Sequence, residues 1–113
     1  MSAAAAIPFP YSGPPELLEP VTAALRRVVD PEVAMSIVDV GLVYGVEIGT
    51  DKALVTMTMT SPACPVTDLI LDEVEAELDR VLPGAMSLET RLVWEPPWST
   101  DRMSERAKRF MGW

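Results

Sequence analysis

Five apolar residues recur at steps of four along residues 66 to 82, namely Val66, Ile70, Val74, Leu78 and Leu82. Residues four apart lie on the same face of an α-helix, and carboxylates fill most of the opposite face in this run. The spacing predicts an amphipathic helix over residues 66–82, ended by Pro83-Gly84. Because a helix with one apolar stripe must bury that stripe against another element, the rest of the chain has to supply a matching apolar layer.

Three segments carry the pattern of β-strands and supply that layer. Residues 53–60, ALVTMTMT, alternate apolar residues with threonines, which predicts a half-buried strand. The valine- and isoleucine-rich run 37–48, IVDVGLVYGVEI, predicts a second strand with a bulge near its glycines. The composition of residues 49–52 is that of a hairpin turn, so these two strands should pair antiparallel. Residues 87–95 alternate again and predict a third strand.

Two further helices complete the expected fold. Apolar residues at helical spacing predict a helix from Glu16 to the Asp30-Pro31 step, with Pro20 in an early helical position. A short basic helix is expected from about Ser104, with Ser104 or Asp101 as its cap. The order α-β-β-α-β plus a short C-terminal helix predicts a compact two-layer α+β sandwich.

The first fifteen residues differ in composition from the rest. They carry no charge and contain four prolines, at positions 8, 10, 14 and 15, which indicates a flexible or partly docked arm outside the core. Residues 16–113 have the length of a single domain.

The charge balance and the residue types that are missing exclude several classes of function. Seventeen acidic against nine basic side chains give a net charge of -8, so nucleic acid and anionic membranes are poor partners. No signal peptide or long apolar segment is visible, which predicts a cytoplasmic protein. The chain contains no histidine, so Ser-His-Asp and Cys-His catalysis and histidine-ligated zinc are excluded within it.

The single cysteine, Cys64, lies in TSPACPVTD, directly before the residues expected to form the acidic helix. If Pro65 occupies the first helical turn, Cys64 falls near the N-cap, where the helix dipole favours a thiolate able to bind soft metals. The alternative is a small buried residue, and the neighbouring carboxylates oppose ionisation. One thiolate cannot hold an iron-sulfur cluster alone, so any cluster would be shared with a partner or a second subunit and held transiently. Without a histidine base, an enzymatic role for Cys64 is disfavoured.

Other features have ordinary structural explanations. Asp39 lies in an apolar run, and a carboxylate bonded to local backbone beside a bulge at Gly41 explains it better than a site does. Thr58 and Thr60 have the pattern of strand residues. Trp94, Pro96, Pro97 and Trp98 form an aromatic corner that favours packing first and a partner surface second.

Four segments in order resemble the SufT and PaaD-like family of metal-sulfur cluster assembly factors. They are DPE (30–32), VDVGLV (38–43), MTMTSPACP (57–65) and WEPPW (94–98), the last followed by Met103-Ser104 and Ala107. The match spans residues 16–112. It implies an iron-sulfur assembly-type fold, a reactive cysteine at Cys64, and Asp39, Thr58 and Thr60 as further positions of one site. PaaD proteins usually continue into a cysteine-rich extension that this chain lacks, so the resemblance is closer to SufT.

Two functions follow from the resemblance. The first is a non-enzymatic accessory factor for iron-sulfur cluster assembly or transfer, in which Cys64 is a ligand for iron or a cluster, Asp39, Thr58 and Thr60 line the site, and a homodimer or a complex with client apoproteins completes it. The second is an adaptor that docks the assembly machinery onto clients, including a PaaD-like role in oxygenase maturation, with a structural cysteine.

Overall fold

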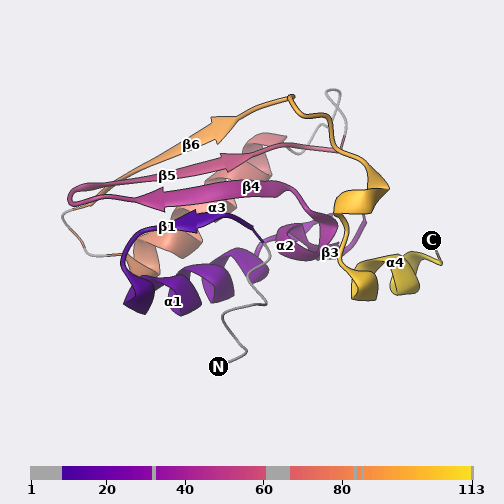
Figure 1. Cartoon of the computed structure of the whole chain (residues 1–113), viewed down its shortest axis with the longest axis horizontal. Coiled ribbons are helices and arrows are strands. Elements are labelled where there is room, and N and C mark those ends of the chain that lie inside the picture. Colours follow the sequence, from indigo (N-terminus) through magenta and orange to yellow (C-terminus); the bar gives the residue numbers. More distant parts are fainter. Residues whose placement is uncertain (1–8, 32, 61–66, 83, 85, 113) are drawn as a thin grey trace.

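The computed structural model describes residues 9–31, 33–60, 67–82, 84 and 86–112. A four-stranded sheet in the order β1-β4-β5-β6 lies over two long helices, α1 and α3, with a smaller group of elements at one end (Figure 1). The elements are β1 (Tyr11–Ser12), α1 (Pro15–Arg26), β2 (Val29–Asp30), β3 (Met35–Ser36), α2 (Ile37–Val40), β4 (Val43–Ile48), β5 (Lys52–Met57), α3 (Thr67–Val81), β6 (Ser87–Leu92), the 3-10 turn η2 (Thr100–Arg102) and α4 (Glu105–Met111).

The sheet combines one hairpin with two parallel pairs. Strands β4 and β5 pair antiparallel, with Val46 opposite Val55, and the backbone N–H of Gly49 donates to the carbonyl of Lys52 at 2.8 Å to close the turn. Strand β6 runs parallel to β5, which α3 makes possible by carrying the chain back across the sheet. The predicted hairpin is confirmed.

The core lies between the helices and one face of the sheet. Ile70, Val74 and Leu78 of α3 are buried at the predicted four-residue spacing, and Val21 and Leu25 of α1 join them. The sheet contributes alternate residues to the same core, among them Val46, Ile48, Val55 and Met57. Each of these side chains stabilises the fold by about 1.5–3 kcal/mol through burial. Glu47, Lys52 and Arg91, on the other face, are exposed, so the predicted two-layer α+β sandwich is confirmed.

The first helix is shorter than predicted. It ends at Arg26, whereas the spacing extended it to Asp30, and Val29–Asp30 instead pair antiparallel with Met35–Ser36. Two consecutive β-branched residues and a proline after Asp30 both favour extended backbone at this point. Pro20 lies in the sixth position of the helix, deeper than expected.

Residues 37–48 do not form one strand. Ile37–Val40 form the short helix α2, and only Val43–Ile48 form β4. The hydroxyl of Ser36 accepts a hydrogen bond from the N–H of Val38 at 3.1 Å, and Gly41 ends the helix in the left-handed conformation with φ of 85°. A serine cap and a terminal glycine five residues later therefore override the strand preference of valine and isoleucine.

Strands β5 and β6 end earlier than their alternating patterns predicted. The last residue of β5 is Met57, so Thr58 and Thr60 follow the strand and are not part of it. Thr58 and Met59 are both buried, which breaks the expected alternation. Strand β6 ends at Leu92 rather than at Glu95.

Both ends of the described chain pack onto the domain. Phe9 is buried in the core and Tyr11–Ser12 pair with β4, while residues 1–8 of the predicted arm lie outside the described residues. The predicted C-terminal helix is confirmed as α4, and Ser104 is its cap, accepting from the N–H of Ala107 at 3.1 Å. No helix in the described ranges is long and apolar enough to cross a membrane.

Candidate functional site

The predicted metal ligand, Cys64, lies outside the described residues, as do its neighbours from Ser61 to Val66. The described chain stops at Thr60, beyond the end of β5, and resumes at Thr67, the first residue of α3. Thr60 is the last described residue before Cys64, which follows it by four positions.

The C-terminal segment packs directly across α2. The indole N–H of Trp98 donates to the carbonyl of Val40 at 2.8 Å, and the N–H of Ser104 donates to the carbonyl of Asp39 at 2.8 Å. Between these bonds, a Cβ on Gly41 would lie 2.2 Å from the backbone oxygen of Arg102. Only a glycine allows this approach, so α2 and the segment from Trp98 to Ser104 are held together.

Thr60 lines a cavity of about 300 Å³ whose other walls are Met59, Trp94, Pro97 and Trp98. Trp98 already uses its N–H on Val40, so it presents an aromatic surface without a free donor. Trp94 is 41% exposed, which is unusual for so large an apolar side chain. The cavity is therefore mainly aromatic, with the Thr60 hydroxyl as a polar group at the point where the described chain leads toward Cys64.

Thr58 lies two residues before Thr60 and is 1% exposed. Its backbone N–H donates to the carbonyl of Leu42 at 2.8 Å. Its hydroxyl oxygen has no hydrogen-bond partner among the described residues. A buried hydroxyl without a partner destabilises a fold by about 1–3 kcal/mol. Packing alone therefore does not explain why a threonine occupies position 58.

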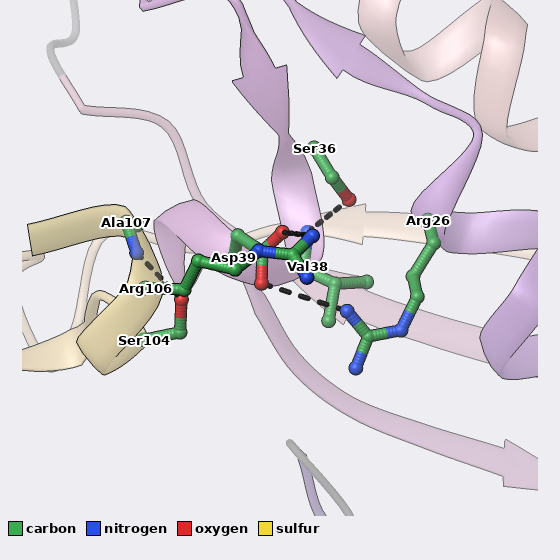
Figure 2. A network of polar contacts seen from close by, with 7 residues as sticks. All are labelled: Arg26, Ser36, Val38, Asp39, Ser104, Arg106 and Ala107. Carbon is green, nitrogen blue, oxygen red and sulfur yellow. Dashed lines mark hydrogen bonds and ion pairs between the residues drawn. The ribbon is translucent and has the colours of Figure 1, made fainter. Parts of the chain in front are cut away.

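Asp39 lies apart from the Thr60 cavity. It is the third residue of α2, and its carboxylate contacts Arg26 of α1 at 3.5 Å and Arg106 of α4 at 3.7 Å (Figure 2). The expectation of a backbone-bonded carboxylate beside a bulge was wrong, because Asp39 is helical and pairs with two arginines. These three residues line a second cavity of about 310 Å³, together with Val29, Ala34, Met35, Ser36, Ala107 and Phe110.

The arrangement brings some of the predicted residues together and separates others. Thr58 and Thr60 lie on one short stretch after β5, whereas Asp39 lines a different cavity, and the bond from Trp98 to Val40 links the first cavity to α2. The site roles of Asp39, Thr58, Thr60 and Cys64 stay predictions. In the part of the chain that the structure describes, no three carboxylates or thiols lie close enough to hold a metal ion.

The contacts of Asp39 with Arg26 and Arg106 were not predicted from the sequence, and neither was the bond from the Trp98 indole to Val40. Arg26 precedes Asp39 by 13 positions and Trp98 follows Val40 by 58, so no local spacing links them. A second fixed contact was missed for the same reason: the hydroxyl of Tyr44 donates to the carbonyl of Pro96 at 2.7 Å.

Known proteins with similar sequences have names that refer to iron-sulfur clusters or Fe-S proteins. Residues 18–89 match the family model described as iron-sulfur cluster assembly protein. The chain is 44% identical over 97 residues to an Fe-S protein maturation auxiliary factor, YitW, of Bacillus subtilis, covering 85% of this chain and 94% of that protein. It is 41% identical over 86 residues to the auxiliary factor SufT of Staphylococcus aureus, covering 75% and 97%.

A solved structure agrees with these sequences. The crystal structure of a domain of unknown function, DUF59, from Bacillus anthracis superposes with a TM-score of 0.79 at 40% identity, covering 86% of this chain and 92% of that one. The shared architecture and the identity over most of both chains establish the relationship. The chain therefore belongs to the SufT-like family of iron-sulfur cluster assembly proteins.

Proposed function

We propose that this protein is an accessory factor in the assembly of iron-sulfur clusters or in their transfer to client proteins, and that Cys64 supplies a thiolate to iron or to a cluster. The observation that carries the proposal is that the only cysteine of the chain follows the aromatic cavity at Thr60 by four residues. Relatives at 41–44% identity are named Fe-S protein maturation auxiliary factors, which supports the accessory role.

The number of available ligands supports a transient role. An iron-sulfur cluster usually takes four cysteine ligands, and this chain has one cysteine and no histidine. The cluster is then cargo rather than a resident cofactor, and the remaining ligands come from a client, a small thiol or a second subunit. A single protein ligand also favours release, because a client with several cysteines competes effectively for the cluster.

The described side chains near Thr60 suit this role. Aromatic surface next to a thiolate limits the access of water, and hydroxyl groups can donate hydrogen bonds to sulfur, both of which tune bound iron. Thr60 lines the cavity, and the buried hydroxyl of Thr58 has no partner within the described residues. We assign Thr58 and Thr60 the role of polar groups near the cargo. Asp39 contacts Arg26 of α1 and Arg106 of α4, and its carbonyl accepts from the N–H of Ser104, so we assign it a positioning role at the C-terminal segment.

Anaerobic incubation with ferrous iron and sulfide tests the proposal. The wild-type protein should gain visible absorbance and retain iron after desalting, and Cys64→Ser should lose both. Wild-type protein alkylated at its single thiol is a matched control, because the sequence is then unchanged. Equal iron and absorbance in Cys64→Ser and wild type would rule out ligation by this thiol.

A second candidate is a non-enzymatic adaptor that docks assembly machinery onto clients, including a PaaD-like role for an oxygenase. It is favoured by two exposed aromatic residues on the C-terminal part of the chain, Trp94 at 41% and Phe110 at 70% exposure. In this case Cys64→Ala preserves maturation of a client in a cell extract, whereas Trp94→Ala or Phe110→Ala abolishes it. Normal maturation with both aromatic variants would exclude the adaptor.

A further inference from the structure

Strand β6 is one of the two edge strands of the four-stranded sheet, and among the described residues no strand pairs with its second edge (Figure 1). The N–H of Ser87 donates to the carbonyl of Asp51 at 3.0 Å, and the N–H of Val93 donates to the carbonyl of Met57 at 2.9 Å. Backbone groups of alternate residues point to opposite edges of a strand. The odd-numbered residues therefore bond to β5, and Leu88, Thr90 and Leu92 direct their N–H and C=O groups to the free edge.

The side chains of β6 divide between the two faces of the sheet. Leu88 and Leu92 pack partly against the core. Glu89 and Arg91 lie on the open face, where Glu89 contacts Lys52 at 2.8 Å and Arg91 at 3.6 Å. The free edge thus combines unpaired backbone groups, two half-buried leucines and one charge of each sign.

We propose that this edge binds β6 of a second copy of the chain in an antiparallel pair. The two-fold axis of this pair passes between Thr90 and Thr90 of the partner subunit. In this register Thr90 faces Thr90 of the partner subunit, and Leu88 faces Leu92 of the partner subunit. All three hydrogen-bonded pairs use residues whose backbone groups point outward, which gives about six interchain hydrogen bonds. The two sheets become one, with both pairs of long helices on the same face.

Charge selects this register over its neighbours. With the axis at Thr90, Glu89 lies directly opposite Arg91 of the partner subunit, and the two-fold repeats the pair. An axis moved by one residue places Glu89 opposite Glu89 or Arg91 opposite Arg91, and like charges directly opposite each other destabilise a strand pair. A register slip of one residue, which moves the axis by half a residue, places backbone groups that point outward opposite groups that point toward β5.

The net charge of -8 on each copy opposes association, but salt screens charges beyond about 8 Å at physiological ionic strength, whereas the strand contacts are shorter than this. The inference extends the proposed function, because it identifies a surface through which a second subunit can join. It does not depend on the thiol, so Cys64→Ser should still dimerise, and failure of metal binding and failure of dimerisation are distinguishable.

Sedimentation velocity across a range of protein concentrations at physiological salt tests the interface. The wild type should move from 12.3 kDa toward twice that mass as concentration rises. Glu89→Arg and Arg91→Glu should each weaken the dimer at least about tenfold, since each replaces two attractive pairs by two repulsive ones. The double variant Glu89→Arg/Arg91→Glu should restore it. Glu47→Arg, the same charge change on a strand that is not at this edge, is the control and should dimerise as the wild type does.

Hydrogen exchange at individual amides provides a second readout. The amides of Leu88, Thr90 and Leu92 should exchange more slowly as concentration rises, whereas those of Ser87, Glu89 and Arg91, already bonded to β5, should change little. A monomer at every concentration would overturn the proposal, and so would a dimer that is unaffected by either single charge reversal.

Discussion

Replacing Gly41 by alanine should separate the C-terminal segment from α2. Gly41 ends α2 with φ of 85°, and a Cβ placed on it would lie 2.2 Å from the backbone oxygen and 2.6 Å from the backbone carbon of Arg102. Ordinary contacts of a Cβ begin near 3.4 Å, so the backbone of Arg102 would have to move by roughly 1 Å. Backbone cannot rotate away as a flexible side chain can.

The expected loss of stability has two parts. Holding alanine in the left-handed conformation costs about 1–2 kcal/mol. Moving Arg102 strains the two flanking bonds, from Trp98 to Val40 and from Ser104 to Asp39, and each contributes about 0.5–1.5 kcal/mol. We therefore expect Gly41→Ala to lower the free energy of unfolding by about 3 kcal/mol and the melting temperature by on the order of 10–15 °C.

Urea unfolding followed by tryptophan fluorescence measures the total loss of stability in Gly41→Ala. The variant Gly112→Ala is the control that separates the backbone strain from the effect of moving Arg102. Gly112 also has positive φ, 78°, but a Cβ there meets no other described residue within 4 Å, so the control carries only the backbone strain. In a proton NMR spectrum, the indole N–H of Trp98 should exchange faster in Gly41→Ala than in Gly112→Ala. If the two variants lose the same stability and Trp98 is equally protected in both, the close approach of Arg102 does not hold the segment.

Three other substitutions test single contacts. Thr58→Val should raise the free energy of unfolding by about 1 kcal/mol, because it removes a buried hydroxyl without a partner among the described residues. A lower free energy of unfolding than that of the wild type, measured with urea, would contradict this. Trp98→Phe should lower it by about 1 kcal/mol, because the carbonyl of Val40 loses its donor; unchanged stability would count against that bond. Lys52 lowers the pKa of Glu89, so Lys52→Gln should lower the melting temperature at pH 7, and the difference from wild type should vanish as pH falls below 4.5 and Glu89 protonates. A difference that persists in acid would exclude this cause.

The parts of the fold that were predicted correctly depend on contacts between near neighbours in sequence. The period of four in α3 and the period of two in β5 each report which face is buried, and the turn at Gly49 is local in the same way. The helix α2 was missed because its valine and isoleucine content favours a strand, while the cap at Ser36 and the left-handed Gly41 depend on only two residues. When a segment is four residues long, its ends outweigh its composition.

The two-layer architecture and the number of protein ligands for a metal follow from the amino-acid sequence alone, because the hydrophobic periods and the count of one cysteine and no histidine do not depend on how the elements pack. The surroundings of each predicted residue could be known only from the folded chain. Thr60 meets Trp94 and Trp98 in one cavity, and Asp39 meets Arg26 and Arg106 in another. These partners come from separate elements, and the path of the C-terminal segment across Gly41 brings Trp98 and Arg106 to α2. Contacts of that kind follow from the packing of whole elements against one another, which no local pattern of residues encodes.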